Sequence, residues 1–217
     1  MKTKTLLLIA ALSLTLNSQK LFAMAHGKPA PEPLAPTTNL QEGDLIFIQS
    51  QTSQSAALLE ATGSTWTHTG ILIKKNSQWY VEEAVGPLVA TALDTFIGRS
   101  RNKAYRILRF KYYDSSMRNA MIADFPKYNK PYDIYFEWSD DRIYCSEFTY
   151  KVFKDITGHD LGTLQKMGDM NLSGPLVQAM IKKRYTDQGK TLDLNEPIIT
   201  PISELSDPDL TLIQSSN

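Results

Sequence analysis

Apolar residues in the first half of the chain follow strand-like patterns. Leu45 to Gln49 predicts a short strand, and a short helix is expected over Ala56 to Thr62. Thr69 to Lys74 and Gln78 to Val85 predict two strands joined by a turn, and therefore an antiparallel hairpin. The pattern continues with expected strands over Val89 to Leu93 and Ala104 to Phe110, and with a short helix over Leu93 to Arg99.

The second half of the chain favours helices. Asp114 is a suitable N-cap for a following helix, and the segment from Pro126 to Trp138 is aromatic and rich in turn formers. From Cys145 onward, apolar residues recur every four positions, which predicts an amphipathic helix that ends at Gly158. A further helix is expected over Pro175 to Lys183.

The N-terminal segment has the three parts of an export signal. Lys2 and Lys4 give it a positive start, residues 6–16 are mostly apolar, and Ala23-Met24-Ala25 offers the small residues of a cleavage site. The prolines that follow favour an extended tether. We therefore expect a signal peptide over residues 1–25, a Pro-rich tether over 26–40 and one folded domain over 41–217. The protein would be periplasmic or secreted, without an integral membrane segment.

Charge and composition argue against an electrostatic nucleic-acid binder. The chain has 217 residues, with 23 Lys and Arg against 23 Asp and Glu, and 42% of its residues are hydrophobic, as in an ordinary soluble domain. Its dense basic run, Lys182 to Arg184, is interpreted as a solvated helix face rather than a phosphate-binding surface. We therefore expect no nucleic-acid partner.

Cys145 is the only cysteine of the chain. It has no partner for an intramolecular disulfide, and a free thiol is a liability in an oxidising compartment. One interpretation is a small buried apolar residue. The other is a nucleophile, because Cys145 begins a predicted helix whose free N–H groups would stabilise both a thiolate and an oxyanion.

A thiol nucleophile needs a base, and the chain has three histidines. His26 lies in the predicted tether, and His159 follows Gly158, where a helix-capping role is favoured. His68 begins a predicted strand, which would hold its ring rigidly. We therefore favour His68 as the base, with an ordinary packed strand histidine as the alternative.

The predicted hairpin supplies a carboxylate to orient that histidine. A tight turn centred near Lys75 and Asn76 would set Glu83 opposite His68 on one face of the hairpin and point Glu82 away. A one-residue change in the turn would exchange the two glutamates. For either of them the alternative is a solvated strand carboxylate, and Glu83 is the preferred partner.

Five short segments occur in one order and resemble a known family. They are GDLIF at 43–47, THTGIL at 67–72, YVEEAVG at 80–86, KPYD at 130–133 and YCSEF at 144–148. From about residue 41 to residue 213, the chain resembles the YiiX/YebB-like family of permuted papain-fold cysteine hydrolases, relatives of the NlpC-type cell-wall peptidases. ITPISEL at 199–205 is similar to that family's C-terminal strand end.

The resemblance implies an α+β fold of the circularly permuted papain-like type, with an antiparallel sheet packed against the Cys-bearing helix and other helices. It implies Cys145 as nucleophile, His68 as base and Glu83 as the third member, in the permuted order His, Glu, Cys. Further candidates for the oxyanion site or the substrate cleft are Tyr144, Ser146, Tyr132 and Asp133, each with packing in the scaffold as the alternative. No cofactor is expected, and no metal, because the histidines and the cysteine lack zinc-site spacing.

Three functions remain open at this point. The first is an exported cysteine amidase or peptidase that cleaves an amide or peptide bond of a cell-envelope or peptidoglycan-derived substrate through a thioester. The second is a lipid acyl hydrolase or acyltransferase, which would need a long apolar cleft beside Cys145, whereas a peptide substrate would need a shorter cleft with polar ends. The third is a catalytically silent envelope-binding module, whose thiol would not be activated.

Overall fold

A six-stranded antiparallel sheet is the centre of the fold in the computed structural model, which describes residues 33–216. Its strands are β1 (Leu45–Ser50), β2 (His68–Lys75), β3 (Gln78–Ala84), β4 (Leu88–Ala92), β5 (Ser100–Phe110) and β8 (Leu210–Ser215). They lie in the order β4-β3-β2-β1-β5-β8, so the predicted hairpin forms the neighbouring strands β2 and β3. A separate two-stranded sheet contains β6 (Gln165–Lys166) and β7 (Pro197–Ile198). The expected signal peptide, residues 1–25, lies outside the described residues.

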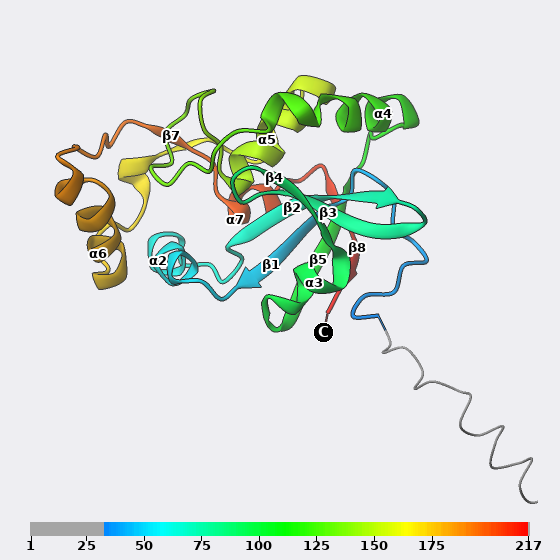
Figure 1. Cartoon of the computed structure of the whole chain (residues 1–217), viewed down its shortest axis with the longest axis horizontal. Coiled ribbons are helices and arrows are strands. Elements are labelled where there is room, and N and C mark those ends of the chain that lie inside the picture. The colour runs from blue at the N-terminus through cyan, green and yellow to red at the C-terminus, as the bar shows by residue number, and fades with distance from the viewer. Residues whose placement is uncertain (1–32, 217) are drawn as a thin grey trace, which may run out of the picture. The chain divides into compact units, whose positions relative to one another are not determined.

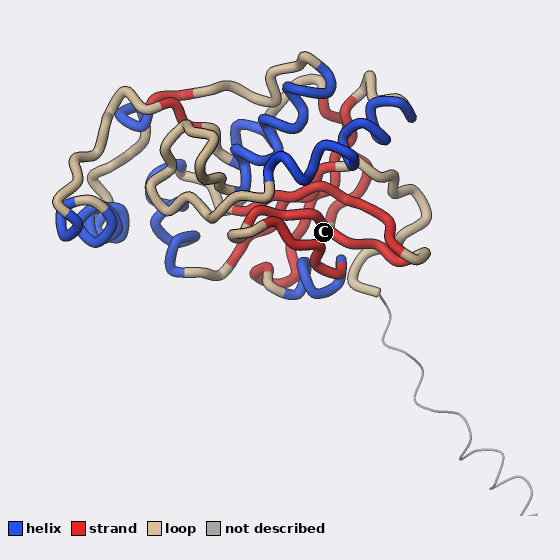
Figure 2. Tube along the Cα trace, turned by 45° about the horizontal axis from the view of Figure 1, so that its top comes forward, coloured by secondary structure: helices blue, strands red, loops and turns tan. Residues whose placement is uncertain are grey.

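Helices cover both faces of the large sheet (Figures 1 and 2). The helices are α2 (Ser53–Thr62), α3 (Leu93–Gly98), α4 (Ser115–Asp124), α5 (Cys145–Thr157), α6 (Pro175–Arg184) and α7 (Pro201–Leu205), with 3-10 turns at Phe125–Tyr128, Met167–Asp169 and Thr186–Gln188. α5 packs on β2 and β3 with α4 and α7 against it, α3 packs on β3, β4 and β5, and α2 contacts α6. No helix within residues 33–216 has the length and apolar character needed to cross a bilayer.

Alternation of side chains along β1 divides the core into two clusters. Phe47 belongs to the larger cluster, which contains Phe148 of α5, whereas Ile48 belongs to the cluster that contains Phe96 of α3. All four side chains are fully buried. The Cys-bearing helix therefore packs on one face of the sheet and α3 packs on the other.

Part of the Pro-rich segment is built into the domain. Ala35 is fully buried and Leu40 is 8% exposed, both in the cluster on the α3 face. The N–H of Leu34 donates to Oδ1 of Asp94 at 2.9 Å. Residues 34–40, which composition alone assigns to an extended tether, therefore contact the fold, because the segment carries apolar side chains between its prolines. Residues 26–32 lie outside the described residues.

The hairpin register differs from the prediction by two residues. Lys75 faces Gln78, so the turn consists of residues 76 and 77, whose φ angles of 50° and 65° are those of a two-residue hairpin turn. Because strand side chains alternate between faces with a period of two, this displacement keeps Glu83 on the face of His68. It sets Glu83 diagonally across from His68 rather than directly opposite.

The C-terminal segment also differs from the expectation. The predicted strand end at residues 199–205 is wrong, because β7 stops at Ile198 and α7 begins at Pro201. Thr200 is the N-cap, and its hydroxyl accepts the N–H of Ser203 at 3.3 Å. Strand β8, which pairs with β5, had no counterpart among the expected strands.

Candidate active site

His68 and Glu83 form a pair at one end of the hairpin. Nε2 of His68 lies 2.6 Å from Oε2 of Glu83, and the two side chains are 13% and 0% exposed. Because Nε2 faces the carboxylate, Nδ1 is the ring nitrogen left for the thiol of Cys145. The ring of Phe96 lies 5.5 Å from the imidazole ring, centroid to centroid, so the imidazole is held on a second side.

Cys145 is the first residue of α5 and is 3% exposed. The backbone N–H groups of Thr69 and Ser146 hydrogen-bond its sulfur, and the second of these belongs to the first turn of the helix. Burial raises the pKa of the thiol. The charge of His68, a hydrogen bond from its ring and the two N–H groups outweigh burial and lower the pKa of Cys145 below its ordinary value.

The pKa of the His68 imidazole shifts in the opposite direction to that of the thiol. Burial lowers the pKa of His68, but the nearby Cys145 sulfur and Glu83 carboxylate together raise it to about 9. Opposite pKa shifts of a thiol and an imidazole in contact favour a thiolate–imidazolium pair. The geometry therefore places a thiol of lowered pKa beside an imidazole of raised pKa.

Glu83 is held by donors that the sequence did not reveal. Oε1 accepts the hydroxyl of Thr91 at 2.5 Å, and Nη2 of Arg99 lies 2.7 Å from each carboxylate oxygen. Burial raises the pKa of Glu83, but His68, Thr91 and Arg99 together keep it below its ordinary value. Thr91 lies in β4 and Arg99 follows α3, so no local motif connects either of them with Glu83.

Tyr144 and Ser146 fasten the start of α5. Tyr144 is 2% exposed, and its hydroxyl accepts the N–H of Ile199 at 3.2 Å. Oγ of Ser146 donates to the carbonyl of Ile199 at 2.9 Å. These two side chains therefore serve the scaffold, and the contribution of Ser146 beside the sulfur comes from its backbone N–H.

Tyr132 and Asp133 have different roles although they are adjacent in the chain. Asp133 is fully buried, and its carboxylate accepts the N–H groups of Tyr135 and Glu137 at 2.8 and 2.6 Å, so it shapes the loop rather than lining a cleft. The hydroxyl of Tyr132 accepts Nε2–H of Gln54 at 2.7 Å. Burial and the nearby Cys145 sulfur raise the pKa of Tyr132, so Tyr132 is the member of the pair that lies near the thiol.

His159 lies in a different cluster from the thiol. Nε2 of His159 is 3.1 Å from Oδ2 of Asp207, and with Asp209 they form the one group of three possible metal ligands among residues 33–216. The same Oδ2 accepts the N–H of Gly162 at 2.6 Å, and Oδ1 accepts the N–H of Asp209 at 2.8 Å. The cluster therefore ties the segment after α5 to the segment after α7.

An apolar cavity of about 60 Å³ lies between α2 and α6. Its walls come mainly from α2, α6 and the segments between them, and its apolar lining includes Leu58, Phe136, Met167, Met170, Met180 and Leu192. The ring of Phe136 packs edge-on against Tyr144, with centroids 5.2 Å apart. Phe136 therefore connects the cavity wall with the residue before Cys145, whereas Cys145 itself does not line the cavity.

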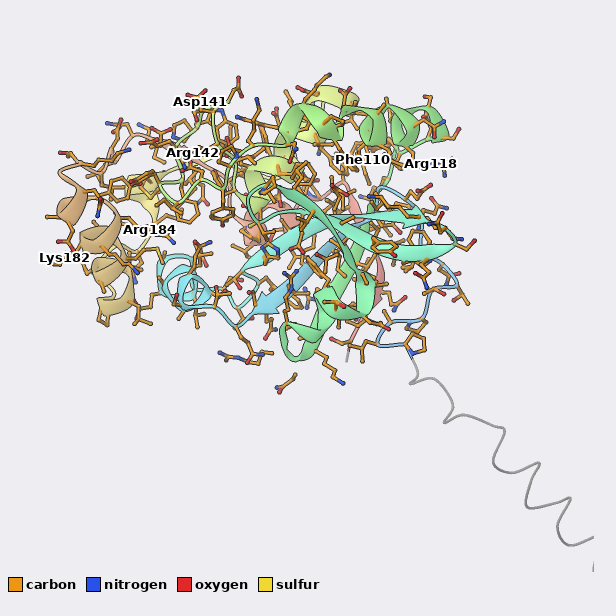
Figure 3. The ribbon with its side chains drawn as sticks, in the orientation of Figure 1. Phe110, Arg118, Asp141, Arg142, Lys182 and Arg184 are labelled. Carbon is orange, nitrogen blue, oxygen red and sulfur yellow. The ribbon has the colours of Figure 1, made fainter. Side chains whose placement is uncertain are left out.

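Arg184 lies at the border of this cavity and departs from the expected solvated basic face. Figure 3 shows Arg184 between α6 and α2, whereas Lys182 lies on the outer side of α6. Nη2 of Arg184 donates to Oε1 of Gln54 at 2.7 Å, and Gln54 donates to Tyr132. A polar chain thus connects the cavity border with the tyrosine near the thiol.

Comparison with known proteins gives a consistent assignment. The model of the family described as "permuted papain-like amidase enzyme, YaeF/YiiX, C92 family" matches residues 39–214. Protein YiiX of Escherichia coli K12 is 39% identical over 175 residues, which are 80% of this chain and 85% of YiiX. A crystal structure described as metalloprotein YiiX from Escherichia coli O157:H7 has a TM-score of 0.77 and 38% identity, over 82% of this chain and 98% of that one. The chain therefore belongs to the YaeF/YiiX family of permuted papain-like amidases.

Proposed function

We propose that this protein is an exported cysteine amidase that cleaves an amide or peptide bond of a cell-envelope or peptidoglycan-derived substrate. The observation that carries the proposal is the contact chain from Glu83 through the imidazole of His68 to the thiol of Cys145 at a helix N-terminus. Membership of an amidase family supports the reaction class. The envelope substrate is inferred from analogy with cell-wall peptidases of related fold.

In the proposed first step, the Cys145 sulfur attacks the carbonyl carbon of the substrate. A C–S bond forms and the C–N bond breaks, while the imidazolium of His68 gives its proton to the departing nitrogen. Free N–H groups of the first turn of α5 stabilise the oxyanion that develops on the carbonyl oxygen. The amine product leaves, and the acyl group remains on sulfur as a thioester.

In the second step, neutral His68 takes a proton from water, and the water oxygen attacks the thioester carbonyl. The C–S bond breaks, the carboxylic acid product leaves, and the thiolate–imidazolium pair is restored. Glu83 keeps the ring in the orientation that both steps require. The net reaction consumes one water molecule and needs no oxidant or reductant.

Export is proposed from the sequence alone. Lys2, Lys4 and the apolar residues 6–16 have the pattern of a signal peptide, with a cleavage site at Ala23-Met24-Ala25. The intact mass of the protein recovered from the periplasm or medium tests this proposal. A mature chain that begins near His26 is expected, and a full-length chain retained in the cytoplasm would contradict it.

The Escherichia coli YiiX structure is described as that of a metalloprotein. In this chain, His159, Asp207 and Asp209 offer suitable atoms within 4.8 Å of one another. Both oxygens of Asp207 already accept backbone N–H groups, so this group suits the closure of two loops better than the binding of an ion. The proposed mechanism includes no step through a metal.

A second candidate is a lipid acyl hydrolase or acyltransferase, and the observation on its side is the apolar lining of the cavity between α2 and α6. A hydrocarbon chain would suit walls that are apolar except at a few positions, such as Thr62, Thr200 and Arg184. Under this alternative the reacting carbonyl would lie at Cys145, and the cavity of about 60 Å³ would have to widen and extend toward the sulfur to admit the chain. The chemistry at sulfur would be the same.

A substrate panel separates these functions. Peptidoglycan stem peptides, N-acyl amino acids and lipid esters are incubated with the wild-type protein and with Cys145→Ala, and products are identified by mass spectrometry. The amidase is supported if the wild type, but not Cys145→Ala, cleaves an amide and carries an acyl adduct on the intact protein. The second candidate is selected if lipid esters are the only substrates turned over. Full activity of a folded Cys145→Ala protein would end both proposals.

A further inference from the structure

Arg99 connects α3 with the His68–Glu83 pair, a contact that the sequence did not indicate. It follows the last residue of α3, and its guanidinium carbon lies 5.0 Å from the centroid of the Phe96 ring. Nη2 lies 2.7 Å from both oxygens of Glu83. The same Phe96 ring lies 5.5 Å from the ring of His68. α3 and the residue after it therefore support both members of the pair. Phe96 packs against the imidazole of His68, and Arg99 binds the carboxylate of Glu83.

The burial of Glu83 makes this cation necessary. Its side chain is 0% exposed, whereas that of Arg99 is 41% exposed and in contact with solvent. A carboxylate removed from water takes up a proton unless positive charge and hydrogen bonds stabilise the ionised form. Arg99 supplies a fixed charge that is present whether or not His68 is protonated.

The same cation limits how strongly Glu83 can hold a proton on His68. In the proposed cycle the imidazole must release a proton to the leaving amine and later take one from water. A buried carboxylate with no other counter-ion would stabilise the imidazolium in both steps. A guanidinium shared between both oxygens offsets part of that charge, and it also fixes the carboxylate plane.

We propose that Arg99 is a positioning residue of this active site, which holds Glu83 against His68 and sets the pH range in which His68 and Cys145 exchange a proton. The inference rests on the proposed function, because it assigns a role within that same site. Thr91 assists Arg99 by donating to Oε1 of Glu83 without adding charge.

Other titratable groups near the pair keep their identity when Arg99 is replaced, although their pKa values respond to the lost charge. Among the described residues they are Glu82 with its partner Lys75 on the opposite face of the hairpin, Tyr132 and Tyr144 near the sulfur, and Glu204 of α7. Removing one positive charge from this set makes the local potential more negative. Every neighbouring pKa should then rise, and the sign of the shift is the same for Cys145 and His68.

The experiment measures how fast iodoacetamide labels Cys145 between pH 5 and 10, by intact mass, in the wild type, Arg99→Gln, Arg99→Lys and Thr91→Val. In Arg99→Gln we expect both inflections of the profile to move to higher pH by about half a pH unit or more. Arg99→Lys keeps the charge and should keep the inflections, but an ammonium cannot stack on Phe96 as the planar guanidinium does, so amide turnover should fall several-fold. Thr91→Val should lower turnover without the shift seen in Arg99→Gln.

Failure of this inference is distinguishable from failure of the proposed function. A wild-type thiol that labels only at alkaline pH overturns the proposed function, and the role of Arg99 with it. If the wild-type thiol is labelled well below its ordinary pKa, and the pH profile of Arg99→Gln superimposes on that of the wild type, only the role of Arg99 is overturned. If Arg99→Gln does not fold, Arg99→Lys still decides, because unchanged turnover in that variant would contradict the positioning role.

Discussion

His68 and Glu83 meet diagonally across the β2–β3 ladder, and the contact passes over a glycine. Ile71 faces Glu82, and the same register continued by one pair sets Gly70 opposite Glu83. Since Gly70 has no side chain, the Glu83 carboxylate can extend along the strand until Oε2 lies 2.6 Å from Nε2 of His68. The contact depends on strand alternation and on an open space between the two side chains.

Glu83→Gln tests which glutamate orients the imidazole. The amide keeps the volume but loses the charge. In either orientation its NH₂ group must face the donor Nη2 of Arg99, which contacts both carboxylate oxygens in the wild type. We expect kcat/KM to fall by about 100-fold or more, as for other triads that lose the orienting carboxylate. The matched control is Glu82→Gln, because Glu82 pairs with Lys75 at 3.6 Å on the other face. Equal losses in the two variants would contradict the assignment.

Gly70→Ala tests the open space under the Glu83 side chain. A methyl carbon on Gly70 would lie 2.4 Å from Cγ1 of Val81 and 2.8 Å from the carbonyl oxygen of Glu82, so the strands must separate. We expect a loss of about 1–3 kcal/mol in unfolding free energy, the usual range for overpacking, together with lower turnover. Gly98→Ala is the control, because a methyl group there meets no atom within 4 Å. Denaturant unfolding that shows Gly70→Ala as stable as Gly98→Ala would refute this account.

Glu204→Gln tests the protonation of a buried carboxyl group. Glu204 is fully buried, Oε1 contacts the hydroxyl of Thr149 at 2.6 Å, and Oε2 has no partner among the described residues. Burial raises the pKa of Glu204 well above its ordinary value. The native state therefore keeps a proton that the unfolded state releases above pH 4.5, and stability falls as pH rises from there.

The Gln side chain cannot ionise, so Glu204→Gln should lose this dependence. Relative to the variant, the wild type should lose up to about 1.4 kcal/mol per pH unit above the unfolded pKa. Thermal unfolding at pH 5, 6, 7 and 8 measures the difference between the two proteins. A difference that stays constant over this range would show that Glu204 is ionised in the native state.

The alkaline limit of turnover follows from His68. Its pKa is raised to about 9, so the imidazolium that we propose as proton donor to the leaving amine persists up to that pH and is lost above it. We expect kcat/KM for an amide substrate to decline above about pH 9, the pKa to which Cys145 and Glu83 raise the imidazole. A rate that stays level to pH 10, with an intact fold, would contradict the role of His68 as general acid.

Local signals were sufficient for most of the elements that build the site. The four-residue apolar period after Cys145, closed by Gly158 with φ 72°, predicts α5 correctly, and Asp114 caps α4 as expected. Thr200 followed by Pro201 is an equally good helix-start signal. The family resemblance indicated a strand end at residues 199–205, and the helix-start signal was not considered there, so α7 was not predicted.

Contacts between distant elements were not available from the sequence. The face that Glu83 shares with His68 depends only on strand alternation and was predictable. The turn at residues 76 and 77 fixes the register. Its predicted centre lay one residue too early, which displaces the facing pairs by two residues. Arg99 was expected at the end of a helix, but its approach to Glu83 requires the packing of α3 on the sheet.

The most direct test of the central claim is the pH dependence of Cys145 alkylation in the wild type and in His68→Asn. Because the chain has a single cysteine, the added mass of one iodoacetamide group reports this thiol alone. We predict rapid labelling of the wild type well below the ordinary thiol pKa of about 8.5, and a shift of His68→Asn to that value or above. Wild-type labelling only at alkaline pH, or identical profiles for the two proteins, would contradict an activated nucleophile at Cys145.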